Sequence, residues 1–194
     1  MKMKEKDELD PYERTRKLAS TAAIAALTCL AGMVLRWVSP ALVPFSVLPA
    51  LFLLAGIILG ARFGALAMVV YVLLGLLGLP VFAAAPFGGL GYVMKPTFGF
   101  LLGYIAGAYC TGLAYRGGGL GRAVVAVLAG LIALYIVGLT WLYFFFQWVM
   151  DKPQDIAAVL TIGFFPFIIS DLIKAGIAAV LGNLIVKRRM KASE

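Results

Sequence analysis

The chain has 194 residues, of which 63% are hydrophobic and only 13% are charged, and its mean hydropathy is +1.00. A soluble domain is roughly half apolar and about a quarter charged, so this composition excludes an ordinary soluble protein and indicates an all-α integral membrane protein. The net charge of +8 does not indicate a nucleic-acid partner, because most basic residues lie at the termini and in short loops, where membrane topology explains them.

The sequence offers little to hold a metal or a cofactor. It contains no histidine, the commonest metal ligand and general base. Cys29 and Cys110 each lie in an apolar run, without the spacing of a metal site or a disulfide framework. We therefore expect two small packing residues here, and no metal and no cofactor.

The first 17 residues, MKMKEKDELDPYERTRK, are charged and are predicted to be a cytoplasmic lead-in. The apolar run that follows lacks a small-x-small cleavage site, so it is expected to be a retained first span rather than a removed signal peptide.

Six membrane spans are predicted, each near the roughly 20 residues that cross a bilayer. They cover about 18–38, 44–59, 63–82, 97–115, 122–150 and 164–186, with a short interfacial segment at about 155–161 before the last. Residues 18–186 would then form one membrane domain, followed by a basic cytoplasmic tail at 187–194.

The distribution of basic residues predicts the topology. With both termini in the cytoplasm, the lead-in, the loop after the second span, the loop after the fourth span and the tail hold thirteen of the seventeen Lys and Arg residues. The outer loops hold only Arg36, Lys95 and Lys152, and Lys174 lies within a span. This bias favours six spans with both ends inside, in a multi-pass protein of the plasma membrane.

The outer segment after the third span, GLPVFAAAPFGGLGYVMKPTFGF, is rich in Gly, Pro and aromatic residues. Pro80, Pro86 and Pro96 prevent a plain helix, and the glycines allow turns. The segment is too apolar to be a solvated linker. Two interpretations remain open, a loop that only packs into the bundle and a lid over an outward-facing pocket.

Asp171 and Lys174 stand out in the last span, FPFIISDLIKAGIAAVLGNLIV. Three residues apart on a helix, they share one face. Ionisable groups in a span are costly and usually face a cavity or each other. The pair is either a structural ion pair that braces the helix or a polar patch in a binding cavity, where Asp171 accepts hydrogen bonds and Lys174 donates them.

Two further patterns have more than one explanation. In the first span Ala19 and Ala23 are four apart, as are Ala22 and Ala26, which lets another helix approach closely, either within this chain or from a partner. The run WLYFFFQWVM at the end of the fifth span is typical of an interfacial aromatic belt, although some of its rings could line a pocket.

Three stretches together resemble a known family. They are LLAGIILGARFGALAMVVYVLLGLLGLPVF (53–82), GGLGYVMKPTFGFLLGY (88–104) and PFIISDLIKAGIAA (166–179), the last with the family's Asp-x-x-Lys segment. The chain resembles the BioY family, the biotin-specific S components of energy-coupling-factor (ECF) transporters. The resemblance covers about 19–186.

The resemblance implies a function and a set of partners. It implies six helices that capture biotin from outside, and a protein that is not itself an enzyme. It also implies a transmembrane coupling subunit and two cytoplasmic ATPases. An Ala-x-x-x-Ala motif in the family's first helix docks to the coupling subunit, which favours that role for Ala19, Ala22, Ala23 and Ala26.

The ligand-binding residues follow from the same resemblance. Asp171 is expected to accept from a ureido N–H of biotin, and Lys174 to pair with Asp171 and donate to the ureido oxygen. Lys95 is a predicted partner for the carboxylate of the tail. Ring and tail contacts are expected from the outer segment and the fifth span, at Phe82, Phe87, Gly89, Tyr92 and Trp141.

Several positions depart from the family pattern. Pro86 and Phe87 stand where relatives often have Gly and Arg, and Lys95 stands where Gly is common. These departures leave open an S component for another vitamin or small metabolite. A third possibility, an intramembrane enzyme with Asp171 as base, is disfavoured because the sequence lacks histidine and a metal motif.

Overall fold

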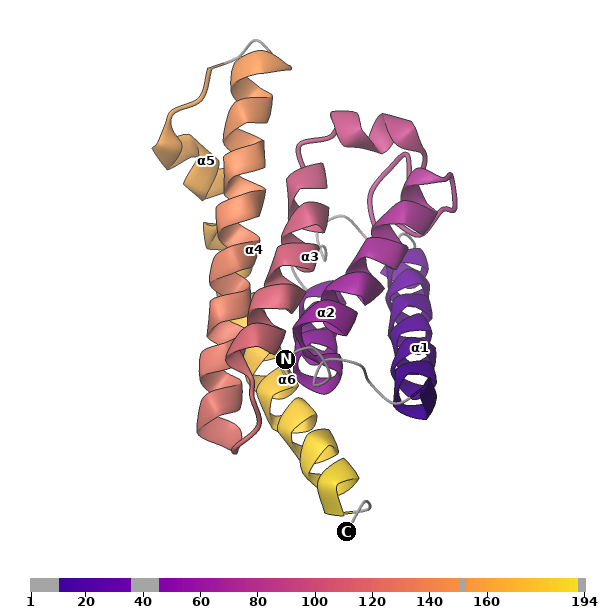
Figure 1. The fold of residues 1–194 in the computed structure, drawn as a ribbon. Helices are drawn as coiled ribbons and strands as arrows, with labels where there is room; N and C mark the ends of the chain where they lie inside the picture. The colour runs from indigo at the N-terminus through magenta and orange to yellow at the C-terminus, as the bar shows by residue number, and fades with distance from the viewer. Residues whose placement is uncertain (1–10, 36–45, 151–152, 192–194) are drawn as a thin grey trace, which may run out of the picture.

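A computed structural model describes residues 11–35, 46–150 and 153–191 of the chain. Within these ranges the protein is helical, without strands (Figure 1). The elements in chain order are α1 (Pro11–Leu35), α2 (Leu48–Leu76), the 3-10 helix η2 (Leu90–Met94), α3 (Phe98–Ala114), α4 (Leu120–Trp148), α5 (Ile156–Gly163) and α6 (Phe165–Lys191).

Helix α2 is two helical segments joined at Gly60. This residue has φ 78° and ψ 179°, a backbone conformation that only glycine adopts without strain. The chain folds back after it. Gly64 consequently lies so close to Ala55 that a Cβ placed on Gly64 would be 2.8 Å from the carbonyl oxygen of Ala55. The two segments correspond to the predicted spans at 44–59 and 63–82, the second of which ends as a helix at Leu76.

The outermost helices extend beyond the predicted spans into charged sequence. Helix α1 begins at Pro11, within the predicted lead-in, where Arg16 pairs with Glu13 at 3.0 Å. Helix α6 continues to Lys191, and the basic residues of its last turn interact favourably with the negative end of the helix dipole. The predicted interfacial segment at 155–161 corresponds to α5, whose first turn is capped by the Asp155 carboxylate.

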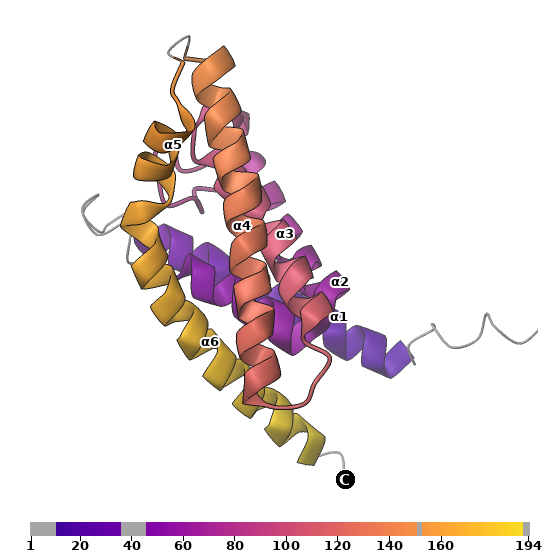
Figure 2. The same ribbon diagram turned by 90° about the vertical axis from the view of Figure 1, so that its left-hand side faces the viewer.

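The bundle is built around α2, α3 and α4. Helix α3 packs between α2 and α4, α1 packs on α2, and α6 packs on both α2 and α4. Figure 2 shows α6 running obliquely beside α4 from α5 to the C-terminal end. Helices α3 and α4 cross closely at two glycines: a Cβ on Gly107 would lie 2.9 Å from the carbonyl oxygen of Gly130. Such small-residue contacts are how helices associate in lipid, where burial of apolar surface supplies little driving force.

The outward faces of the helices are apolar. On α4 the side chains of Val125, Ile132 and Ile136 are exposed, and on α6 those of Ile173 and Ile177. A helix that is apolar on all sides indicates a lipid-facing span. Helices α1, α4 and α6 are long and apolar enough to cross a membrane, α2 is so only by the total length of its two segments, and α3 is a shorter apolar helix.

The two ends of the bundle differ in composition. The start of α1, the α3–α4 turn and the end of α6 lie toward the lower end in Figures 1 and 2, and the 77–97 segment and the C-terminal end of α4 lie toward the other. The lower elements carry most of the described basic residues, and Arg116 and Arg122 flank the turn. The Lys17 ammonium lies 5.7 Å from the centre of the Phe63 ring, which brings α1 beside the Gly60 turn.

The close crossing of α3 and α4 predicts a sensitive position at Gly130. A Cβ there would overlap the Thr111 hydroxyl and lie 3.0 Å from the carbonyl oxygen of Gly107. We expect Gly130→Val to destabilise the protein by about 1–3 kcal/mol and to lower its Tm in detergent. On the same helix Gly121→Val is the matched control, because a Cβ there has no neighbour within 4 Å. Equal Tm values for the two variants would contradict the packing argument.

Candidate functional site

A cavity of about 300 Å³ lies in the half of the bundle that carries the 77–97 segment. This volume is at the lower end of the range, about 300–1,000 Å³, that is usual for small-molecule sites. Its walls come from both segments of α2, from α3, α4, α5 and α6, and from the 77–97 segment. That segment contributes Ala83, Ala84, Tyr92, Pro96 and Thr97, so it covers the cavity rather than packing elsewhere.

One end of the cavity is formed by an ion pair on α6. The Lys174 ammonium lies 2.9 Å from Oδ1 of Asp171, and it also donates to the Ser170 hydroxyl at 3.1 Å. The side chain of Lys174 is 12% exposed and that of Asp171 is 6% exposed. Because they share a helix face, both reach the cavity wall.

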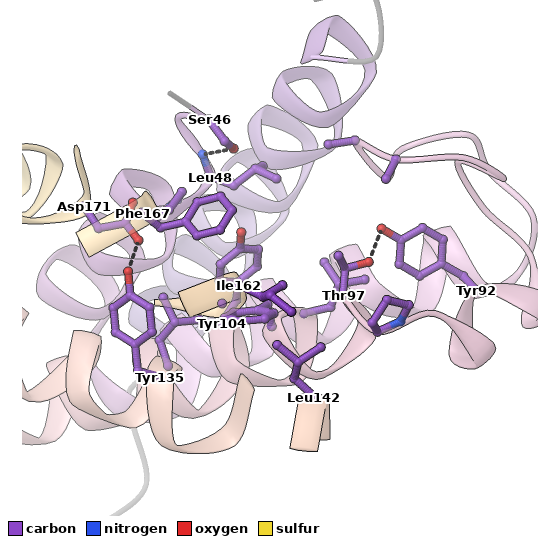
Figure 3. Close-up of a pocket in the computed structure, with 18 of the residues that line it drawn as sticks. Ser46, Leu48, Tyr92, Thr97, Tyr104, Tyr135, Leu142, Ile162, Phe167 and Asp171 are labelled. Carbon is purple, nitrogen blue, oxygen red and sulfur yellow. Dashed lines mark hydrogen bonds between the residues drawn. The ribbon is translucent and has the colours of Figure 1, made fainter. Parts of the chain in front are cut away.

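Tyr135 of α4 completes this end of the cavity. Its hydroxyl donates to Oδ2 of Asp171 at 2.8 Å, across the interface between α4 and α6 (Figure 3). The Tyr135 ring packs edge-on against Phe164, with the ring centres 4.9 Å apart, which fixes its direction. Each carboxylate oxygen of Asp171 therefore has one protein donor and retains capacity for another.

The other end of the cavity is lined by hydroxyl groups. Tyr92 and Thr97 share a hydrogen bond of 3.3 Å, and Figure 3 shows them at the opposite side from Asp171. Burial raises the pKa of Tyr92, so its hydroxyl stays neutral at ordinary pH. A third hydroxyl, that of Ser46, lines the cavity away from this end, beside the start of α2, and accepts from the Leu48 amide at 3.3 Å (Figure 3).

The rest of the wall is largely apolar. Figure 3 shows Tyr104 of α3, Leu142 of α4, Ile162 of α5 and Phe167 of α6 along it. Phe100 of α3 also belongs to the lining. Such a surface suits the apolar body of a small molecule, while the polar groups fix its orientation.

Of the eight residues predicted to bind ligand, Asp171, Lys174 and Tyr92 line the cavity. Phe82 is fully buried behind the wall, with its ring centre 4.4 Å from that of Tyr92 and 5.7 Å from that of Tyr71. It therefore supports lining residues and does not line the cavity itself.

The other four predicted residues are also outside the lining. Phe87 and Gly89 have φ values of 66° and 90° and shape the turn of the outer segment. The Trp141 indole donates to the carbonyl oxygen of Lys95 at 3.2 Å and packs against Phe98. The side chain of Lys95 is exposed. A ligand contact by any of these four stays a prediction.

Tyr135, Tyr104 and Phe167 are cavity residues that sequence reasoning missed. Tyr135 left a signal, because it is the one hydroxyl within the apolar run GLIALYIVGL of α4. Tyr104 and Phe167 left none, since an aromatic residue on an apolar helix is as readily explained by packing.

The alanines of α1 lie on its outer face. Ala19, Ala22, Ala23 and Ala26 are exposed, whereas Thr21, Ala25 and Thr28 face the bundle. These four alanines do not pack within the described part of this chain. In the same part of the chain there is no group of three or more Cys, Asp or Glu residues that could hold a metal ion.

Comparison with known proteins identifies the family. A sequence profile of the BioY family matches residues 2–191. The biotin transporter BioY of Thermotoga maritima is 37% identical over 148 residues, 75% of this chain and 83% of the relative. That of Rhizobium etli is 35% identical over 191 residues, 89% and 94% of the two chains. The fold is similar to a crystal structure of the S component for biotin from an ECF-type ABC transporter, with a TM-score of 0.73, 22% identity and coverage of 93% and 95%. The chain belongs to the BioY family.

Proposed function

We propose that this protein is the substrate-binding membrane subunit of an ECF transporter, which captures biotin from outside the cell and delivers it inward. The observation that carries the proposal is the cavity with the Asp171–Lys174 pair at one end and a largely apolar wall beyond it. The relatives named as biotin transporters, 37% and 35% identical, support biotin as the ligand.

The chemistry of biotin matches the polarity of the cavity. Its ureido ring offers two N–H donors beside one carbonyl acceptor, and Asp171 and Lys174 offer the complementary acceptor and donor. Tyr135 holds the Asp171 carboxylate in place from α4. The sulfur ring and the aliphatic tail of biotin then lie along the apolar wall of Phe100, Tyr104 and Phe167.

The proposed orientation in the membrane has six spans, with both termini in the cytoplasm of a plasma-membrane protein. Two observations support it. Division of α2 at Gly60 yields the sixth apolar segment, and the basic ends of α1 and α6 lie on the same side of the bundle as the α3–α4 turn (Figure 1). The cavity lies toward the other side, so its ligand enters from outside.

Transport requires partners, which we propose to be a transmembrane coupling subunit and two cytoplasmic ATPases. The alanine face of α1, defined by Ala19, Ala22, Ala23 and Ala26, is the proposed docking surface, because its small side chains let a second helix approach closely. The ion pair is neutral overall, which limits the cost of moving the subunit within the membrane.

Biotin binding to the purified protein tests the main proposal. We expect binding at submicromolar concentration by titration calorimetry and a loss of about 10- to 100-fold in Asp171→Asn, because a hydrogen bond to a charged group is lost. No binding of biotin below micromolar concentration would contradict the assignment, and a different small molecule co-purifying with the protein would identify the ligand instead.

Two further variants separate ligand recognition from stability. Asp171→Asn leaves the buried Lys174 ammonium without its counter-ion, so the double change Asp171→Asn with Lys174→Met restores neutrality. Biotin binding that survives the double change would show that the pair only braces α6. Glu13→Gln is the control for charge loss, since Glu13 forms an ion pair at the exposed start of α1.

Tyr135→Phe tests the contribution of α4. Without the hydroxyl, Asp171 loses a donor and its carboxylate is less well positioned, so we expect biotin affinity to fall about 10-fold. The matched control is Tyr143→Phe on the same helix, because Tyr143 does not line the cavity. Equal affinities for the two variants would remove Tyr135 from the binding site.

A bulky side chain on the alanine face tests docking. We expect Ala22→Trp to abolish co-purification with the coupling subunit and to leave biotin affinity unchanged, since the residue is exposed and no residue of α1 lines the cavity. The control is Ala157→Trp, an equally drastic change at an exposed position of α5. Retained co-purification of Ala22→Trp would place the interface on another face.

A further inference from the structure

The cavity has a single cationic side chain among its described lining residues, Lys174, and this ammonium is already paired with Asp171 at 2.9 Å. Building on the proposed function, we propose that the site recognises the ureido ring of its ligand and does not discriminate between a carboxylate and an uncharged group at the other end. Uncharged esters and amides of biotin, including those linked to an amine through the tail, are then ligands of the same site.

Charge balance around the ion pair sets the direction of the ligand. A ligand carboxylate placed against Lys174 would put two carboxylates around one ammonium, in a place where the side chains are only 6% and 12% exposed. Like charges in a poorly solvated site repel strongly, and the group would carry a net negative charge. The neutral ureido ring leaves the charge at zero and satisfies both partners, so the tail points away from Lys174.

The tail then reaches the hydroxyl end of the cavity. Tyr92 and Thr97 line that end. A hydroxyl donates to a carboxylate, an ester carbonyl or an amide carbonyl alike, and it also accepts from an amide N–H. These groups therefore do not distinguish the acid from its uncharged derivatives.

Lys95 directly precedes two lining residues, Pro96 and Thr97, in the sequence. Its side chain is exposed and absent from the lining, while its carbonyl oxygen is held by Trp141. An ammonium in water pairs only weakly with a carboxylate, because solvent and salt screen the attraction. On this proposal Lys95 does not bind the tail, in contrast to the contact predicted for it from the sequence.

Competition binding with four ligands tests the inference on the full-length protein in detergent or nanodiscs. The probes are biotin, biotin methyl ester, biotinamide and a biotin methylated on one ureido nitrogen. We expect Kd values for the ester and the amide within about threefold of that for biotin, and a loss of at least about 30-fold for the N-methyl compound. Ester binding at least about 30-fold weaker than that of biotin would overturn the inference.

A lysine variant tests whether Lys95 contacts the carboxylate of the ligand. In Lys95→Met, the ratio of ester to acid Kd is expected to equal that of the wild type, with Lys191→Met at the exposed end of α6 as the matched control. A selective loss of affinity for the acid in Lys95→Met would show that this lysine reads the carboxylate. If biotin itself fails to bind, the proposed function falls with the inference, whereas biotin binding without ester binding contradicts the inference alone.

Discussion

An ion pair buried in an otherwise apolar bundle constrains the rest of the structure. Removing Asp171 and Lys174 from water is costly, and their mutual attraction offsets that cost only when the remaining hydrogen-bonding capacity is also satisfied. Tyr135 and Ser170 supply part of it, at 2.8 Å and 3.1 Å. Because Tyr135 belongs to α4, the pair also ties α6 to α4 and sets where a polar ligand can be received.

The packing of the helices explains why a cavity exists at one end of the bundle. Glycines bring α2, α3 and α4 into backbone contact around Gly56, Gly107 and Gly130, which leaves no space there. Toward the other end, larger side chains such as Phe100, Tyr104 and Phe167 hold the helices apart and line the space between them. The 77–97 segment forms part of the wall around that space. The bundle is therefore closely packed in one half and contains the cavity in the other.

The pair itself was accessible to sequence reasoning, because two opposite charges three residues apart in an apolar run share a helix face. Its partner Tyr135 lies 36 residues away on another helix, and only the packing of α4 against α6 brings the two together. The aromatic residues of the outer segment illustrate the same limit. Composition indicates that they pack inward, yet Tyr92 lines the cavity and Phe82 lies behind it, a difference decided by the path of an irregular loop.

The sequence by itself determined the membrane-protein class, the helical segments, the bias of basic residues and the position of the ion pair. These depend on composition and on spacing within one helix, both of which are local. Only the tertiary structure decided that α2 folds back at Gly60, that the alanines of α1 face outward, and that Lys95 lies off the cavity. Each of these depends on which surfaces of distant segments meet, and an apolar helix in lipid has no polar face to indicate that in advance.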